Sequence, residues 1–254
     1  NILVTPADHL ILQEDAFDEA ICRSLDYVKA HPKLVTLGVR PSRPETGYGY
    51  IQFTDVEDEH FVKVKTFTEK PNIEMAKVFY ESGEFLWNSG MFAWNVQTIL
   101  DAFHQYLPSL TSILDEVKGA YATDEEQSRV SQVFSECPNI SIDYAILEKA
   151  DNVMVLPVDF GWADLGTWGS LYELKREEPR ANVALHTKAL FYEAEGNIVS
   201  LDGDPEKQLV VVQGINDCVV AQSKGVLLIC KRDEEQRIKE FMGEASVQFD
   251  KKFD

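Results

Sequence analysis

The sequence predicts an α/β fold with a mostly parallel sheet and helices on both of its faces, followed by a small β-rich region at the C-terminal end. Two observations support this prediction. An amphipathic segment of helical period, Asp15–Ala30, lies between two apolar runs with strand character, Asn1–Val4 and Leu34–Val39. A strand–helix–strand succession at this spacing is typical of a parallel βαβ unit. After residue 182 the helical pattern gives way to short β runs.

The first helix is the best defined of these elements. Its apolar side chains recur every three or four residues and so share one face, and Pro32 prevents the helix from continuing far past Ala30. The apolar runs on either side of it are predicted to be buried strands. The apolar face of the helix consists of Phe17, Ile21, Leu25 and Val28.

The middle of the chain alternates strands and helices. A polar loop leads into two strands, Tyr50–Phe53 and His60–Glu69, which we expect an acidic turn at Asp55–Glu59 to join. Strand character returns at Phe85–Trp94. The other elements predicted here are a helix from Asn72 to about Glu81, a mostly helical stretch from Val96 to Phe134 with breaks near Pro108 and Thr123, a helix from Ser141 to about Ala150, a buried strand at Val153–Val158 and a helix at Leu165–Arg176.

The region from Asn182 to Cys230 contains several short β runs, separated by glycines at intervals of about ten residues. We therefore predict a boundary near residue 180, with residues 1–180 forming an α/β domain and residues 181–254 a β-rich domain. Lys231–Met242 is expected to close the second domain as an amphipathic helix. This region carries no obvious chemistry, so we interpret it as a packing or oligomerisation module through which a homodimer could form.

The composition limits the classes of function. The chain has 254 residues, 44% of them apolar, and a formal net charge of −19. Such an acidic surface argues against binding to nucleic acid or to an anionic membrane. The four cysteines lack metal-binding or redox spacing, which favours free thiols in a reducing cytosol. No apolar run approaches the roughly 20 residues that span a bilayer, and no signal peptide is visible, so we expect a cytoplasmic protein.

Two acidic residues each follow an apolar strand: Asp8 follows Ile2–Val4, and Asp164 follows Val153–Val158. Ligands of open α/β sheets bind at the carboxyl ends of the strands. Two carboxylates brought together there repel each other unless a cation lies between them, and Mg²⁺ takes one or two carboxylates plus phosphate oxygens of a substrate. We therefore hypothesise a Mg²⁺ site at Asp8 and Asp164 that handles a phosphate. The alternative is a local cap, by Asp8 of the next turn and by Asp164 of the helix at Leu165.

Two further segments carry groups suited to a sugar phosphate. The glycines on either side of Tyr48, which include Gly49, allow the backbone to approach a sugar or base closely, although a plain turn would also explain them. Glu69 and Lys70 end a predicted strand. They could accept sugar hydroxyls and meet a phosphate, or they could form an ordinary solvated pair.

The segment Trp87–Gly90 places the amide of Asn88 and the hydroxyl of Ser89 beside an aromatic ring, an arrangement suited to sugar hydroxyls. A plain β-turn is the alternative. Other catalytic motifs are not evident. The histidines lack metal spacing, and the chain has no G-x-S-x-G, G-x-G-x-x-G or G-x-x-x-x-G-K pattern.

Six short segments occur in order along the chain, and together they indicate a protein family far more specifically than any one of them does. They are Pro6–His9, Glu45–Ile51, Phe67–Pro71, Trp87–Phe92, Ser141–Ala145 and Trp162–Trp168. Together they resemble the mannose-1-phosphate guanylyltransferases of the sugar nucleotidyltransferase family. The resemblance is strong over residues 1–175 and weaker over the β-rich remainder, and it implies a Rossmann-like sheet.

The resemblance also implies a reaction. Mannose 1-phosphate attacks the α-phosphorus of GTP and gives GDP-mannose and pyrophosphate, with Mg²⁺ as cofactor. Such chemistry depends on positioning and charge neutralisation more than on a covalent nucleophile. By motif match, Asp8 and Asp164 would hold the metal, and Lys70 would steady a phosphate. The substrate-binding set implied by the same segments is Tyr48, Gly49, Glu69, Asn88, Ser89 and Asp143.

One feature of the family is missing from the chain. Its Gly-rich phosphate loop lies upstream of the Pro6–His9 motif, whereas this chain opens on Asn1 within a predicted strand. We therefore expect further residues before Asn1, and expect residues 1–254 alone to be inactive. Two alternatives stay open: another sugar 1-phosphate nucleotidyltransferase, and a regulatory subunit that binds a sugar nucleotide without turnover.

Overall fold

The computed structural model of the chain describes residues 1–56 and 60–249. The chain separates into two compact units, the first formed by residues 1–7 and 11–162 and the second by residues 8–10 and 163–254. This grouping in space does not test the predicted domains, residues 1–180 and 181–254, which therefore stay a prediction.

The first unit is built on a six-stranded sheet with the strand order β1-β6-β3-β7-β5-β4. Only β3 and β7 are parallel neighbours, and the other pairings are antiparallel. The sheet is therefore mixed, and the prediction of a mostly parallel sheet was wrong. The strands are β1 (Ile2–Val4), β3 (Leu34–Val39), β4 (Tyr50–Val56), β5 (Val62–Thr68), β6 (Phe85–Trp94) and β7 (Val153–Val158).

The first strand differs from its prediction in two ways. β1 and β3 are not neighbours, because the antiparallel strand β6 lies between them, so they do not form the simple parallel βαβ unit expected. β1 also lies at the edge of the sheet, where Ile2 is 38% and Val4 42% exposed rather than buried. An apolar run of three residues does not reveal how many neighbouring strands will cover it.

The predicted strands in the middle of the chain are confirmed as β4, β5 and β6. Residues 57–59 of the acidic turn predicted between the first two lie outside the described residues. β6 pairs with β4 as well as with β1 and β3, so five strands form a closed cycle of pairings. A cluster of buried side chains belongs to strands of this cycle: Ile51, Val62, Leu86 and Val155.

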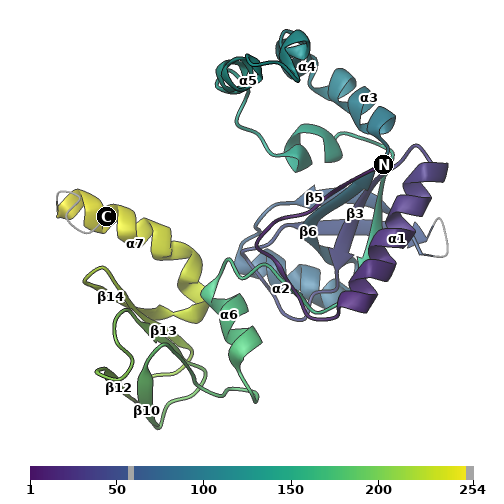
Figure 1. Cartoon of the computed structure of the whole chain (residues 1–254). Helices are drawn as coiled ribbons and strands as arrows, with labels where there is room; N and C mark the ends of the chain where they lie inside the picture. Colours follow the sequence, from purple (N-terminus) through teal and green to yellow (C-terminus); the bar gives the residue numbers. More distant parts are fainter. Residues whose placement is uncertain (57–59, 250–254) are drawn as a thin grey trace. The chain divides into compact units, whose positions relative to one another are not determined.

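Helices cover both faces of the sheet, as predicted. On β3, Val35 belongs to the buried cluster shared with α1 and α2, whereas its neighbour Leu34 belongs to the cluster shared with α3 and η2. Successive residues of a strand point to opposite faces, so the two clusters lie on opposite sides. Figure 1 shows α1 alongside β3 and β6. The helices are α1 (Glu14–Ala30), α2 (Ile73–Ser82), α3 (Val96–Tyr106), α4 (Pro108–Asp115), η1 (Lys118–Ala120), α5 (Glu126–Phe134) and the π-helix η2 (Asp143–Leu147).

The second unit is β-rich, as predicted. It begins with α6 (Trp168–Lys175), whose Tyr172 packs on Val183, Ile198 and Val219. Four strands have the order β14-β13-β11-β9, and β10 pairs in parallel with β12. The predicted closing helix is instead a 3₁₀-helix followed by an α-helix that ends later. These elements are β9 (Val183–Leu185), β10 (Lys188–Tyr192), β11 (Ile198–Leu201), β12 (Leu209–Gln213), β13 (Cys218–Ser223), β14 (Val226–Lys231), η3 (Arg232–Arg237) and α7 (Ile238–Gln248).

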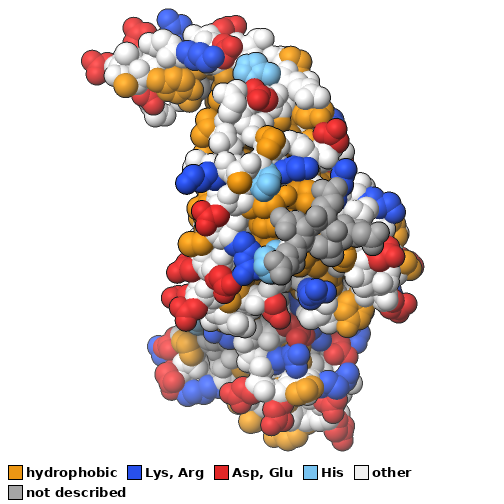
Figure 2. All heavy atoms as spheres, turned by 90° about the vertical axis from the view of Figure 1, so that its right-hand side faces the viewer, with side chains coloured by type: hydrophobic (Ala, Val, Ile, Leu, Met, Phe, Trp, Pro, Cys, Tyr) orange, Lys and Arg blue, Asp and Glu red, His pale blue; other side chains and the backbone are white. Residues whose placement is uncertain are grey.

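On the face shown in Figure 2, the Lys and Arg side chains of the described residues stand among Asp and Glu rather than in one broad basic patch. Helices formed by residues 1–56 and 60–249 are all too short or too polar to cross a membrane.

Gly38 is required by the crowding inside the closed cycle of strands. A Cβ atom at this position would lie 2.6 Å from Cγ2 of Val155 and 2.7 Å from Cδ1 of Leu86. We predict that Gly38→Ala lowers the free energy of unfolding by about 1–3 kcal/mol through overpacking. Gly119→Ala is the matched control in the same unit, because a Cβ there would meet nothing within 4 Å. Urea unfolding of both variants checks this, and equal stabilities would contradict the crowding.

Candidate functional site

Four of the residues predicted to bind substrate line one hollow in the first unit. Its cavity volume is about 10 Å³, and it is bounded by Gly49, Glu69, Asn88 and Asp143. These residues come from segments far apart in the sequence. The pairing of β4 with β5 and β6 brings the first three together, and Asp143 of η2 joins them through its hydrogen bond with Asn88. The other lining residues are Tyr50, Phe67, Thr68 and Glu148.

Asn88 is the most tightly fixed member of this set. Its backbone N–H donates to the carbonyl of Gly49 at 2.8 Å, and its side-chain Nδ2 donates to Oδ1 of Asp143 at 2.8 Å. The amide oxygen accepts from the backbone N–H of Gly90 at 3.1 Å. The segment lies within strand β6, so the alternative of a plain β-turn at Trp87–Gly90 is excluded. These contacts fix which way the amide group of Asn88 faces.

A side chain at Gly49 would displace the carboxylate of Glu69. A Cβ atom there would lie 2.6 Å from Oε2 of Glu69. The absence of a side chain lets the Glu69 carboxylate come close to the β4 backbone, which is the use of glycine anticipated from the sequence.

The hollow is acidic. Burial raises the pKa of Asp143, and the nearby charge of Glu69 raises it further, whereas the hydrogen bond from Asn88 acts in the opposite direction. The pKa of Glu148 is raised by burial and then by the charges of Asp143 and Glu69. Carboxylates that are held together in this way are good acceptors for hydroxyl groups of a ligand.

Lys70 lies beside the hollow, with its Nζ 3.1 Å from Oε1 of Glu69. Its side chain is 60% exposed, and its backbone has a φ of +43°, which a residue with a side chain rarely adopts. The left-handed backbone turns the chain sharply at the end of β5. The ammonium group is therefore next to the hollow and still open to an anion from solvent.

Two predicted substrate residues do not line this hollow. Ser89 is 1% exposed and its hydroxyl donates to the carbonyl of Leu37 at 2.6 Å. Tyr48 is 5% exposed and packs edge-on against Trp87 and Trp162, each with a ring-centroid distance of 5.1 Å. Ser89 follows Asn88 in β6, so strand alternation directs it to the opposite side. Both residues make packing contacts.

Glu148 is the lining residue that the sequence analysis missed. Its backbone N–H donates to the carbonyl of Asp143 at 2.9 Å, five residues earlier. This bond belongs to the π-helical geometry of η2, which brings residues five apart onto one side of the turn. An α-helix, which the sequence predicted here, would direct the two carboxylates to different sides. The spacing of Asp143 and Glu148 in the sequence therefore did not indicate that both line the hollow.

Asp8 and Asp164 flank a second, two-stranded sheet formed by β2 (Leu10–Ile11) and β8 (Trp162–Ala163). The N–H of Leu12 donates to the carbonyl oxygens of residues 160 and 161, at 3.3 and 3.2 Å. The two strands therefore run antiparallel from this contact, so that earlier residues of β2 lie opposite later residues of β8. Both residues therefore follow or precede the strand pair at the same end, and both belong to the second compact unit.

The Asp164 carboxylate is held by its own loop. Its Oδ1 accepts from the N–H of Gly166 at 3.0 Å and from the hydroxyl of Ser170 at 3.2 Å. Leu165 between them has a φ of +52°. The helix cap is Thr167, whose side chain accepts from the N–H of Ser170, so the alternative that Asp164 caps this helix is excluded.

The donor set of Asp8 and Asp164 suits a hard divalent cation. Within residues 1–56 and 60–249, no group of three or more His, Cys, Asp or Glu side chains could hold a metal ion. Mg²⁺ is commonly bound by one or two carboxylates, with water and substrate phosphates filling its other positions. Two acidic residues at the same end of a strand pair therefore fit this type of ion better than a site made wholly of protein ligands.

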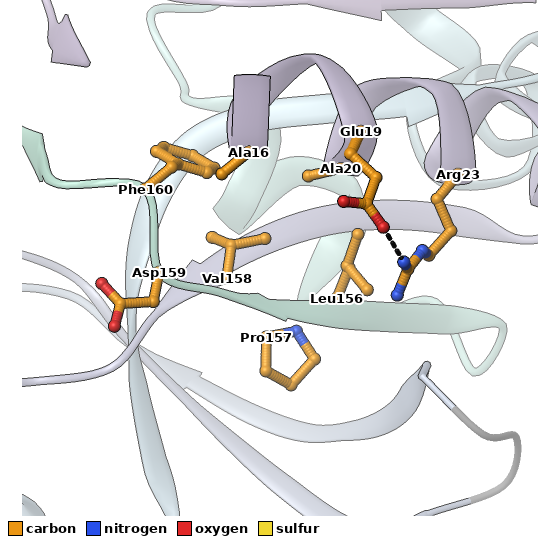
Figure 3. A pocket seen from close by; sticks show the side chains of 9 residues that line it. All are labelled: Ala16, Glu19, Ala20, Arg23, Leu156, Pro157, Val158, Asp159 and Phe160. Carbon is orange, nitrogen blue, oxygen red and sulfur yellow. Dashed lines mark hydrogen bonds and ion pairs between the residues drawn. The ribbon is translucent and has the colours of Figure 1, made fainter. Parts of the chain in front are cut away.

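A second hollow lies between α1 and the end of β7 (Figure 3). It is lined by residues of α1 from Ala16 to Arg23 and by Leu156–Phe160. The Arg23 guanidinium is paired with the Glu19 carboxylate at 2.5 Å on the same helix. An anion would have to displace Glu19, so we assign no ligand to this hollow.

Comparisons with known proteins show the family of the chain. The sequence profile of the nucleotidyl transferase family matches residues 1–180. The chain therefore belongs to the nucleotidyl transferase family.

Individual proteins of known identity are similar to the chain over most of its length. The chain is 37% identical to a mannose-1-phosphate guanylyltransferase of Escherichia coli K12 over 94% of the chain and 50% of the relative. It is 36% identical to one of Salmonella typhimurium LT2, over 94% of the chain and 49% of the relative. A crystal structure described as the mannose-1-phosphate geranyltransferase of Thermus thermophilus matches with a TM-score of 0.80 and 30% identity, over 96% of this chain and 69% of that one. The chain spans about half the length of the curated relatives that it matches.

The raised pKa of Asp143 predicts a pH dependence of stability. A carboxyl whose pKa is higher in the folded than in the unfolded protein binds more protons when folded, so stability falls as pH rises from the unfolded to the folded pKa. We predict that Asp143→Asn flattens this fall as the pH rises above about 4, the ordinary pKa of an aspartate carboxyl. Urea unfolding at a series of pH values measures it, with Asp18→Asn on the surface of α1 as the control for loss of one charge. An unchanged slope in Asp143→Asn would contradict the assignment.

Proposed function

We propose that the protein transfers a guanylyl group from GTP to mannose 1-phosphate, giving GDP-mannose and pyrophosphate. The observation that carries this proposal is the hollow in which Gly49, Glu69, Asn88 and Asp143 meet. It offers one amide and several carboxylates to the hydroxyls of a sugar. The names of the curated relatives in Escherichia coli and Salmonella typhimurium favour mannose 1-phosphate as that sugar.

In this proposal the hollow binds the mannosyl group. Glu69 accepts hydrogen bonds from sugar hydroxyls, and Asn88 both donates and accepts. Asp143 orients the Asn88 amide through their 2.8 Å hydrogen bond. Gly49 keeps the floor of the hollow clear. We assign Tyr48 and Ser89 to the support of these groups, since both are buried in packing contacts.

Asp8 and Asp164 are proposed to hold Mg²⁺, and Lys70 to steady a phosphate. When bound, the ion supplies positive charge that neutralises the phosphates during transfer. The two carboxylates set its position, and the exposed ammonium of Lys70 offers a further cation to the sugar phosphate. Nothing in this assignment requires a covalent intermediate with the protein.

The proposal predicts a specific loss in an Asn88 variant. Asn88→Ala removes the only side-chain amide that lines the hollow among the described residues and leaves the half-buried carboxylate of Asp143 without this donor. Loss of such a partner costs about 1–3 kcal/mol, so kcat/KM for mannose 1-phosphate should fall about 5- to 150-fold. Asn72→Ala, at the exposed cap of α2, is the matched control.

The assay measures GDP-mannose formed from GTP and mannose 1-phosphate, with glucose 1-phosphate as the competing substrate. It is run on the unaltered protein and on both variants. Preference for glucose 1-phosphate would favour the other nucleotidyltransferase alternative. Tight binding of GDP-mannose with no turnover would favour the regulatory subunit. A homodimer formed through the β-rich region stays a prediction.

A further inference from the structure

Glu235 reaches across the second unit to the first turn of α6. It lies in η3, and its Oε2 accepts a hydrogen bond from the backbone N–H of Gly169 at 2.9 Å, 66 residues away in the sequence. The first N–H groups of a helix have no partner within the helix, and a carboxylate is favourable there because of the helix dipole. Thr167 satisfies the N–H of Ser170 at 3.1 Å. One local and one distant residue therefore fix this turn.

The same turn holds the carboxylate of Asp164. The hydroxyl of Ser170 is 2.8 Å from Oγ1 of Thr167 and donates to Oδ1 of Asp164 at 3.2 Å. Ser170 is 2% exposed, so its hydroxyl is held in a fixed environment. Glu235 and Asp164 are therefore hydrogen-bonded to two successive residues of the first turn of α6, Gly169 and Ser170.

We propose that Glu235 is a positioning residue for the metal site. By fixing the first turn of α6, Glu235 makes Ser170 hold the Asp164 carboxylate in the orientation in which it binds a divalent cation. This inference rests on the proposed function, which makes Asp164 a metal ligand. It gives the C-terminal region, interpreted from the sequence as a packing or oligomerisation module, a part in positioning a metal ligand.

Gly169 provides an independent way to disturb the contact. A Cβ atom on Gly169 would lie 2.8 Å from Oε1 of Glu235, and that carboxylate is the end of a flexible side chain. Gly169→Ala therefore displaces Glu235 without altering its charge. Alanine is also a better helix former than glycine, so α6 itself is not weakened by the change. A fall in metal affinity in this variant cannot be explained by loss of the helix.

The test titrates residues 1–254 with Mn²⁺ in the presence of mannose 1-phosphate and follows free Mn²⁺ by electron paramagnetic resonance. Groups that orient metal ligands typically change metal affinity about 10- to 100-fold, so Glu235→Ala, Ser170→Ala and Gly169→Ala should each weaken binding at least about tenfold. Glu235→Gln keeps an oxygen acceptor for Gly169 and should restore most of the affinity. Asp233→Ala removes an equal charge from an exposed position of the same element and should bind as the unaltered chain does.

Asp164→Asn separates failure of this inference from failure of the proposed function. If Asp164→Asn binds Mn²⁺ as tightly as the unaltered chain, the proposed metal site is wrong. If Asp164→Asn loses binding while Glu235→Ala and Gly169→Ala bind normally, Glu235 has no positioning role and the inference is overturned. An equal loss in Glu235→Ala and Asp233→Ala would also overturn it, because the effect would then be one of overall charge. Should Glu235→Ala fail to fold, Gly169→Ala decides.

Discussion

The position of Asn88 in the long strand β6 is the constraint on which the candidate sugar site depends. β6 pairs with three strands, and its partner β4 delivers the carbonyl of Gly49 to the backbone of Asn88. The Asn88 side chain then reaches Asp143. Where these groups come close together, side chains are excluded: Gly49 makes room for Glu69, and Gly38 makes room for the apolar interior of the closed strand cycle. Polar contacts of the hollow and apolar packing of the sheet are therefore two consequences of one set of strand pairings.

The sequence predicted elements whose evidence is local. The first helix shows its period in its own residues, and it was placed within one residue of its observed start. Strand β6 was also located, although nothing in its pattern showed that it runs against β1 and β3. Parallel and antiparallel strands share the same two-residue alternation of side chains, so direction is decided by pairing that a single sequence does not display. The exposed edge position of β1 was missed for the same reason.

The candidate site was predictable in part. Short motifs identified Glu69, Asn88 and Asp143, and these residues do meet in space. Glu148 was not identified because its approach to Asp143 depends on a π-helical turn. The contact of Glu235 with Gly169 could not be anticipated, since 66 residues separate them and neither lies in a recognisable motif. Ser89 is the reverse case, because its motif was found but its side chain does not line the hollow. Strand alternation directs its hydroxyl to the carbonyl of Leu37.

The account depends most directly on the hollow being the place where the sugar binds. A crystal structure of the chain with mannose 1-phosphate tests this without any assumption about turnover. We predict that the sugar ring lies over Gly49, with its hydroxyls bonded to the carboxylate of Glu69 and the amide of Asn88. A mannose 1-phosphate molecule bound elsewhere, with this hollow left to solvent, would contradict the account.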